Sequence, residues 1–310
     1  MCYTGIYTCV HIKPPRASLR TKLSRAELQI LDSLRTSKAR AFSHSQLAAL
    51  LYKERGRGTL ARHTTFDDFV SFLIDRGHLV PITLRSAQYK QQITRYCFGS
   101  PSAFELACSI RPSGYLSHSA ACRFHGLIDA DSQPMYVNVE QSIKPTSSAS
   151  LTQTAIDRAF ASKQRESKLS FTNKDTTVTI LSGKNTGRLG VEERQDPVFG
   201  PVKVTNIERT LIDISVRPAY AGGISRILEA YRSARTRVSV PTIASLLETI
   251  GLIYPYAQAI GFMMERAGFA AEQCALLRPL ISEFRFYLAH QMKNPAYHET
   301  WRIYHPRDLH

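Results

Sequence analysis

Apolar residues recur at helical spacing in three successive segments of the first hundred residues, and a capping box precedes each segment. In a capping box, a Ser or Thr hydroxyl and the side chain three residues later satisfy free backbone N–H groups at a helix start. The boxes lie at residues 24–27, 43–46 and 65–68. In the first predicted helix, Leu28, Leu31 and Leu34 fall on one face, and Leu23 with Leu28 is expected to form a hydrophobic staple. The pattern therefore predicts three short helices.

A hairpin is predicted directly after these helices. Residues 79–84 and 93–98 are short apolar runs, and the polar, basic stretch 85–92 separates them. Three helices followed by a hairpin is the element order of a winged helix-turn-helix. We therefore assign residues 22–100 to such a domain, preceded by an N-terminal extension of residues 1–21.

This architecture indicates which residues would meet DNA, because its third helix enters the major groove and its hairpin contacts the backbone. Base-reading side chains are expected on the exposed start of the third helix: His63, Thr64, Thr65, Asp68 and Ser71. Phosphate contacts are expected from the approach to that helix and from the hairpin: Arg55, Arg57, Arg62, Arg85 and Lys90. Asp67, Asp68 and Asp75 make the third helix acidic, which is unfavourable near phosphates. A winged helix that makes only protein contacts is therefore the alternative.

The rest of the chain predicts a mixed domain and a largely helical C-terminal part. A fourth capping box at residues 102–105 opens a helix that ends near Arg111, and a short helix runs from Ser117 to Gly126. Strands are expected at residues 135–139, 176–181 and 202–205, with one surface helix in the polar insert 141–168. Asn206 caps the next helix, and further helices are expected near 220–235, 242–250, 255–268 and 274–289, with a last strand at 301–304. The expected fold class is α+β, with a small sheet in a domain of residues 101–205 and a helical domain of residues 206–310.

Charge separates the first third of the chain from the rest. Of the 310 residues, positions 1–100 carry 16 basic and 6 acidic side chains, so about two thirds of the net charge of +15 lies there. Such a bias is typical of a domain that binds a polyanion, although a basic solvated surface is the simpler reading. The six cysteines form no CxxC pair, and no signal peptide or long apolar run is seen, so a cytoplasmic protein without a membrane partner is expected.

Two segments carry motifs: PSGYLSHSAACRFHGL at residues 112–127, and residues 204–230, which include ERTLIDISVRPAYAGG at 208–223. The first resembles one segment of the AbiEi-type antitoxins, an abortive-infection family of type IV toxin–antitoxin systems, and the second resembles the ERTLxDxxxRPxxAGG signature of that family. The motif residues are Tyr115, Ser117, His118, His125, Gly126, Glu208, Arg209, Thr210, Asp213, Arg217, Pro218, Gly222 and Gly223.

The resemblance implies a bifunctional protein with two partners. Its winged helix would repress its own operon by binding repeats in the promoter, as a dimer or only on paired half-sites. Its C-terminal domain would oppose a nucleotidyltransferase-like toxin without a stable complex. Two alternatives stay open: a protein-interaction module that neutralises a toxin by direct binding, and a solitary regulator without a toxin.

The second motif also has a reading independent of the resemblance. Glu208 lies in the first turn after Asn206, where the helix dipole favours a carboxylate, and Asp213 lies four residues after Arg209. A structural corner held by an ion pair and an interaction surface both fit these residues.

Catalytic and metal-binding chemistry finds little support in the sequence. His118, Cys122 and His125 fall on one helix face at a spacing compatible with metal ligation, but no fourth ligand is suggested. No GxxxxGK[ST], GxGxxG or GxSxG motif occurs, and the carboxylates form no nuclease-like set. We therefore expect a protein that is not an enzyme and needs no cofactor or metal, and a DNA-processing enzyme is the remaining alternative.

Overall fold

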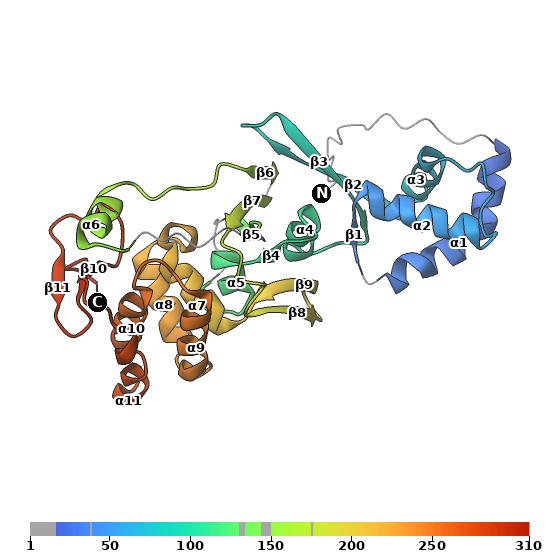
Figure 1. Ribbon diagram of the computed structural model, residues 1–310. Helices are drawn as coiled ribbons and strands as arrows, with labels where there is room; N and C mark the ends of the chain where they lie inside the picture. Colours follow the sequence, from blue (N-terminus) through green and yellow to red (C-terminus); the bar gives the residue numbers. More distant parts are fainter. Residues whose placement is uncertain (1–16, 38, 130–133, 144–149, 175, 310) are drawn as a thin grey trace, which may run out of the picture.

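The computed structural model describes residues 17–37, 39–129, 134–143, 150–174 and 176–309, with side chains from residue 22 onward. Helices lie at both ends of the molecule and a large, curled mixed sheet lies between them (Figure 1). The α+β class expected from the sequence is confirmed. Most of the predicted extension 1–21 and part of the insert 141–168 lie outside the described residues. No helix in the described residues is long and apolar enough to cross a membrane.

The described N-terminal part consists of three helices, a hairpin that follows them and one short strand that pairs with the hairpin. Its elements are α1 (Ala17–Thr36), β1 (Ala41–Phe42), α2 (His44–Gly56), α3 (Phe66–Asp75), β2 (Leu79–Ser86) and β3 (Gln91–Phe98). The capping boxes of α2 and α3 form as expected, at Ser43 and Thr65. Apolar side chains of all three helices and of both hairpin strands share one core, to which α3 contributes Phe69 and Leu73.

The predicted start of the first helix is wrong. Helix α1 is already formed at Ala17, and Leu28 is 79% exposed, whereas Leu23, Leu31 and Leu34 are buried. The expected staple between Leu23 and Leu28 is therefore absent. Ser24 and Glu27 instead contact Arg76 and His78 at the end of α3, so a pattern that often marks a helix start here serves a tertiary contact.

The middle of the chain supplies most of the sheet. Its elements are α4 (Ala103–Ile110), β4 (Tyr115–Leu116), α5 (His118–Phe124), β5 (Met135–Glu140), α6 (Gln153–Ala161), β6 (Ser170–Asn173), β7 (Thr176–Gly183), β8 (Val191–Asp196) and β9 (Gly200–Thr205). Ser102 caps α4 through a capping box, as expected. Leu106 and Ile110 of α4 pack against Val137 and Val202 on one face of the sheet.

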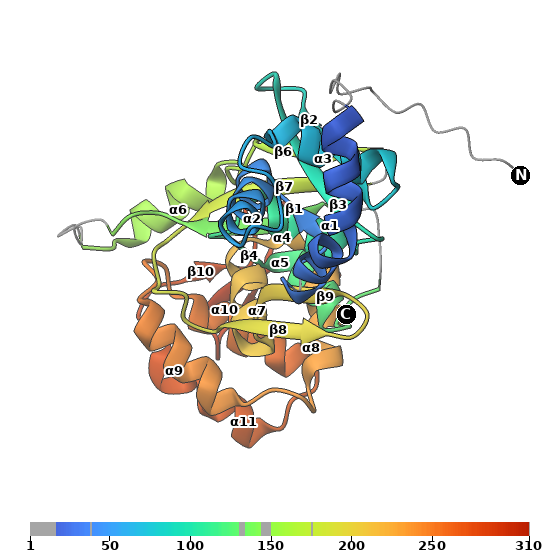
Figure 2. The same ribbon diagram turned by 90° about the vertical axis from the view of Figure 1, so that its right-hand side faces the viewer.

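The sheet is larger than the sequence predicts. Within the described ranges, nine strands form one sheet in the order β1-β3-β2-β6-β7-β5-β4-β9-β8 (Figure 2). The pairs β5–β7 and β4–β9 are parallel and the other pairs are antiparallel. The small sheet expected within residues 101–205 is thus wrong, because β6 pairs with β2 at Arg85 and Thr172. An edge strand with free N–H and C=O groups readily takes such a neighbour.

The C-terminal part is helical up to residue 280 and then changes character. Its elements are α7 (Ile207–Val216), η1 (Pro218–Ala221), α8 (Ile224–Ala234), α9 (Val240–Ile250), α10 (Tyr256–Arg266), α11 (Ala271–Ala275), η2 (Arg278–Leu280), β10 (Phe286–Tyr287), β11 (Ala296–His298) and β12 (Ile303–His305). The helix expected near 274–289 is wrong, because Pro279 interrupts the segment and β10 pairs with β12 instead. Within the described residues, β10, β12 and β11 form a second sheet.

Candidate functional site

Most residues expected to meet DNA are exposed. The exposed ones are Arg57, Arg62, His63, Thr65, Arg85 and Lys90. The first four lie between the end of α2 and the first turn of α3, and the last two lie at the far end of the hairpin. Arg57 contacts the buried carboxylate of Glu54, with Nη1 3.3 Å from Oε1, and its side chain stays 56% exposed. These side chains are available to a partner on the outside of the molecule.

Three residues expected to contact DNA, Thr64, Ser71 and Arg55, are not exposed. Thr64 and Ser71 are buried, so the expectation that they lie on an exposed face is wrong. Most faces of α3 are packed against the core, because the side chains of Phe69, Val70, Phe72 and Leu73 are all buried. Ser71 is enclosed among them.

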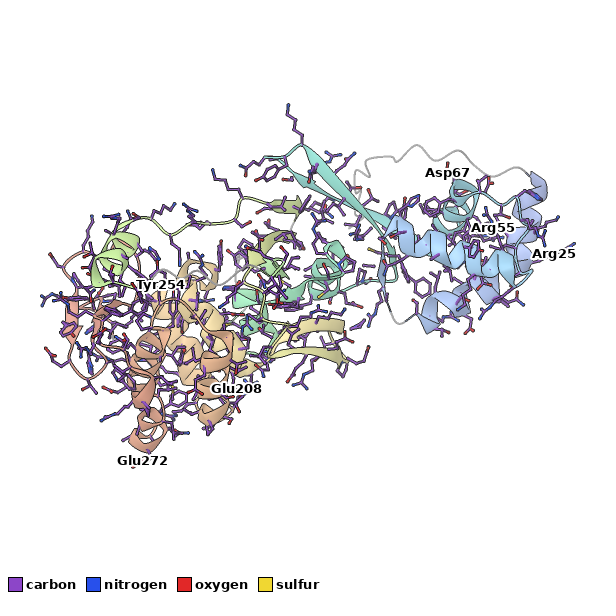
Figure 3. All side chains as sticks on the ribbon, viewed as in Figure 1. Arg25, Arg55, Asp67, Glu208, Tyr254 and Glu272 are labelled. Carbon is purple, nitrogen blue, oxygen red and sulfur yellow. The ribbon has the colours of Figure 1, made fainter. Side chains whose placement is uncertain are left out.

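Arg55 has a structural contact instead of an open position. It is half-buried, and its Nη2 donates to the carbonyl of Thr64. Arg55 thus holds the turn that leads into α3. Figure 3 shows Arg55 and Asp67 on the helices at the N-terminal end of the molecule.

The acidic residues of α3 have two different roles. Asp68 completes the capping box, since its Oδ2 accepts from the Thr65 N–H at 3.1 Å and from the Thr65 hydroxyl at 2.6 Å. Its charge is thereby directed at the helix N-terminus, where the dipole stabilises it. Asp67 and Asp75 are exposed and give the body of α3 an acidic outer face. The loop that precedes α3 is consequently better suited to a polyanion than the helix body.

The two sequence segments that resemble the antitoxin family lie side by side in the structure. Leu116 of β4 pairs with Val204 of β9. At the end of α5, Nε2 of His125 lies 2.6 Å from the carbonyl oxygen of Thr205. The rings of His118 and Tyr220 meet edge to face, with centroids 5.3 Å apart. Residues about ninety positions apart in the sequence therefore form one site, which we call the motif cluster: the residues of β4, α5, α7 and η1 together with Thr205.

A hydrogen-bonded network runs along the sheet beneath the motif cluster. The Tyr115 hydroxyl donates to Glu140 Oε1 at 3.1 Å and accepts from Asn138 Nδ2 at 2.7 Å. Glu140 also accepts from the backbone N–H groups of Thr186 and Arg188. Burial alone would raise the pKa of Glu140, but a hydrogen bond from the Thr186 hydroxyl, together with those from the two backbone N–H groups and from Tyr115, lowers it below its usual value. Glu140 is thus kept as a carboxylate by its partners.

Arg209 connects this network to α7. Its Nε lies 2.8 Å from Asp213 Oδ1, which confirms the ion pair expected from the i, i+4 spacing, and both side chains are largely buried. Its Nη1 donates to the carbonyl of Leu189 at 2.8 Å and to the hydroxyl of Thr186 at 3.2 Å. Burial lowers the pKa of Arg209, but the charge of Asp213 and the hydrogen bond to it outweigh this and raise it. The guanidinium is a fixed charge at the centre of the motif cluster.

Ser117 and His118 begin α5 in an unusual way. Ser117 is the residue before the helix, but its hydroxyl makes no capping bond and lies 2.9 Å from His118 Nδ1. His118 has a φ of +52°, a left-handed conformation that is uncommon for a non-glycine residue. Burial lowers the pKa of His118 to about 4, with Asp213 acting against the shift and Arg217 and Arg209 acting with it. The imidazole is therefore neutral at physiological pH.

The possible metal ligands of α5 are not brought together as a site. His125 is engaged with Thr205, and burial strongly raises the pKa of the Cys122 thiol. Among the described residues, no three His, Cys, Asp or Glu side chains are grouped so that they could hold a metal ion.

The other motif residues shape the corner between α7 and the following helices. Glu208 accepts from the backbone N–H of Ser239 at 2.9 Å and so ties α7 to the start of α9. The Thr210 hydroxyl lies 2.7 Å from that of Thr205. Pro218 begins η1, and Gly222 with φ +84° and Gly223 with φ +95° reverse the chain into α8. Arg217 ends α7 and donates to the carbonyl of Arg165 at 3.3 Å, and Gly126 follows α5 with φ +62°.

No sequence pattern indicates that several residues take part in the hydrogen-bonded network around Glu140 and Arg209. Asn138 and Glu140 end a strand that was predicted only from its alternating pattern, and Thr186 and Leu189 lie in a loop. Their roles depend on β5 and β7 being neighbours, which no local pattern encodes.

No family model matches the sequence, and no curated protein matches it. Among solved structures, it is similar to the crystal structure of the RV2827C protein from Mycobacterium tuberculosis, with a TM-score of 0.53 and 15% sequence identity. The similarity covers 92% of this chain and 91% of that chain, so the two share a fold over nearly their whole length.

Proposed function

We propose that this chain is a DNA-binding transcriptional autoregulator and the antitoxin of a type IV toxin–antitoxin system, opposing a nucleotidyltransferase-like toxin. In this proposal residues 22–100 act as a winged helix-turn-helix, and the motif cluster belongs to the part that counters toxicity. The protein is neither an enzyme nor a cofactor carrier, and it acts in the cytoplasm.

The observation that carries the DNA-binding part is the set of basic and polar side chains before α3. Arg57, Arg62 and His63 are exposed directly ahead of the helix that a winged helix would direct toward the major groove. The order α1-β1-α2-α3-β2-β3 and the concentration of positive charge in the first hundred residues support the same role. Because α3 itself exposes Asp67 and Asp75, base contacts are assigned to His63 and Thr65 at the start of the helix and not to its body.

The antitoxin part rests on the resemblance of the two motif segments. Their joining into one motif cluster supports treating them as a unit instead of as two chance matches. Opposition to the toxin is tested by co-expression: the full chain should restore growth of cells that express the product of the neighbouring gene.

The DNA-binding part is tested by titrating a labelled duplex from the region upstream of the gene at several salt concentrations. The slope of the logarithm of the DNA-association constant against the logarithm of salt concentration should become less steep by about 0.9 in Arg57→Ala and in Arg62→Ala, because each variant loses one phosphate contact. Lys293→Ala, an exposed lysine of the C-terminal part, is the matched control and should change nothing. If the wild-type chain bound upstream and unrelated duplexes with equal affinity, the regulator assignment would be wrong.

The acidic face of α3 favours a second candidate, a module that neutralises a toxin by direct binding. Asp67 and Asp75 suit a basic protein partner better than DNA. Stable co-purification of the neighbouring gene product, lost in Asp67→Lys, would support this candidate over the regulator.

A further inference from the structure

In the part of the chain that the structure describes, one face of the central sheet is polar and is not covered by a helix between the two helical ends. Side chains of directly paired residues project from the same face of a sheet. The pairs Thr83 with Thr94, Arg85 with Gln92 and Arg85 with Thr172 therefore share one face, and Ser170 lies on it two residues before Thr172. We call these residues the polar strip: Thr83, Arg85, Gln92, Thr94, Ser170 and Thr172.

The opposite face and both ends of the polar strip are occupied. On the opposite face, Leu84, Phe171 and Val178 belong to the core that α4 covers. On the same face as the strip, Tyr96 belongs to the N-terminal helical core, and at the other end Tyr136 packs against Tyr220 with ring centroids 4.8 Å apart. Between these ends, Arg85, Gln92 and Thr172 are exposed. Among the described residues, the strip is thus an exposed stretch of the sheet, and Figure 1 shows helices at both ends of that sheet.

Hydroxyl groups are ordered along the strip by pairing with one another. The Thr83 and Thr94 hydroxyls lie 3.0 Å apart, those of Thr172 and Thr177 3.2 Å, and those of Ser170 and Thr179 2.8 Å. Each pair uses one proton for the internal bond, which leaves a second proton for an acceptor outside the sheet. The strip accordingly offers a row of positioned donors.

A hollow of about 790 Å³ lies where the polar strip meets the tip of the hairpin. Its described lining is Arg85, Ser86, Ala87, Gln88, Lys90, Gln91, Gln92, Lys168, Ser170 and Thr172, which includes three cations and no acid. Arg85, Lys90 and Lys168 are exposed, and within the described residues they have no carboxylate partner. The electrostatic field of the hollow is therefore that of an anion-binding site.

Ser86 gives a second, independent indication of a ligand. Its side chain is 3% exposed, it lines the hollow, and its Oγ is a buried polar atom without a hydrogen-bond partner in the described part of the chain. Buried hydroxyl groups in native structures are nearly always paired, so an unpaired one beside a cationic hollow indicates a missing acceptor.

We propose that this hollow and the polar strip bind the phosphate backbone of double-stranded DNA, so that the contact surface continues from the hairpin to β6. This inference rests on the proposed DNA-binding function and extends it to Lys168 and Thr172, which lie outside the predicted winged helix. The three cations come from β2, from the hairpin turn and from the segment before β6, and the polar strip continues from them along the sheet, which suits a polymer of phosphates better than a single small anion. The donors of Thr172 and Gln92 complete the set, because backbone phosphates accept from hydroxyl and amide groups as well as from cations.

The test uses the full chain and two labelled duplexes of equal length, one from the upstream region and one of unrelated sequence. With both duplexes, Lys90→Ala combined with Lys168→Ala should make the dependence of log K on log salt concentration less steep by about 1.8, because two phosphate contacts of about 0.9 each are lost. Lys293→Ala is the matched control, and Arg57→Ala combined with Arg62→Ala reports on the approach to α3.

The outcomes separate this inference from the proposed function. If only the Arg57 and Arg62 changes weaken binding, the proposed function stands and the hollow is not a DNA contact. If sequence preference is absent but the Lys90 and Lys168 changes still reduce the slope, the hollow binds DNA and the autoregulator role fails. Absence of binding to either duplex at low salt would overturn both.

Discussion

Nε2 of His125 lies 2.6 Å from the carbonyl oxygen of Thr205, joining the end of α5 to the end of β9. Nε2 carries the proton in this hydrogen bond, which fixes the tautomer of the ring. Burial lowers the pKa of His125, whereas the bond to Thr205 acts in the opposite direction. The contact links the two motif segments through a ring that needs no charge to make it.

The ion pair of Arg209 and Asp213 should dominate the stability of the motif cluster. Asp213→Leu leaves a buried guanidinium without its carboxylate and should lower the free energy of unfolding by about 3–5 kcal/mol. Arg209→Leu combined with Asp213→Leu should cost less than the sum of Arg209→Leu alone and Asp213→Leu alone, because no uncompensated charge remains. Urea unfolding of the three variants measures the difference, and additive effects would show that the two charges are not coupled.

His118 should make stability depend on pH. The pKa of His118 falls from 6.5 to about 4 on folding, chiefly through burial, so the unfolded chain binds the proton more tightly. The stabilisation that comes from keeping this ring neutral is complete above pH 6.5. It is lost as the pH falls to about 4, which lowers the free energy of unfolding by about 3 kcal/mol in all. Urea unfolding between pH 4 and pH 8 should show a shallower decline for His118→Asn, since Asn tolerates the positive φ and does not titrate.

The matched control for that profile is His63→Gln, because His63 is exposed. Its decline should match that of the wild-type chain. Identical profiles for wild type and His118→Asn would contradict the assignment to His118.

Thr65 should act first as a helix cap. Thr65→Ala removes the acceptor for the Asp68 N–H and should lower the free energy of unfolding by about 1 kcal/mol, whereas Thr65→Ser keeps the hydroxyl and should be nearly neutral. Thermal unfolding compares the two variants. Equal losses from both would mean that the methyl group and not the hydroxyl matters.

Two helical glycines should respond in opposite directions to alanine. A Cβ on Gly261 in α10 would overlap the indole of the buried Trp301, so Gly261→Ala should destabilise by about 1–3 kcal/mol. Gly56 at the end of α2 has open space around it and no positive φ, so Gly56→Ala should stabilise by about 0.5–1 kcal/mol. Differential scanning calorimetry should show the thermal unfolding midpoints of the two variants shifted in opposite directions from that of the wild-type chain. Shifts of the same sign would contradict the close packing on Gly261.

Local patterns in the sequence predict those features whose partners are close in the chain. The capping boxes at Ser43, Thr65 and Ser102 form because donor and acceptor are three residues apart. The box at Ser24 does not form because α1 begins at Ala17, so Ser24 lies inside the helix and not at its start, and both side chains contact the end of α3. Ser24 accepts from Arg76 at 3.2 Å, and Glu27 lies 2.6 Å from Nε2 of His78.

Features that depend on distant partners could not be predicted in the same way. Strand β8 is a polar edge strand that exists through its pairing with β9, and its sequence lacks an apolar alternation. Glu140 accepts a hydrogen bond from Thr186, and Lys168 lines a hollow together with residues of the hairpin, although these partners are distant in the sequence. In the candidate site, sequence spacing therefore identified Arg209 and Asp213 but not the network that surrounds them.

The joint between β2 and β6 has a mechanical consequence. In the described residues, β2 pairs with β3 at eight positions but with β6 only at Arg85 and Thr172. A ladder of many pairs fixes the angle between strands, whereas one pair acts as a pivot. The tilt of the hairpin against the rest of the sheet is therefore set by side-chain contacts with α4: Leu84 and Cys97 share its core, and Arg95 donates to the carbonyl of Ser109 from Nε at 3.0 Å and from Nη2 at 2.8 Å.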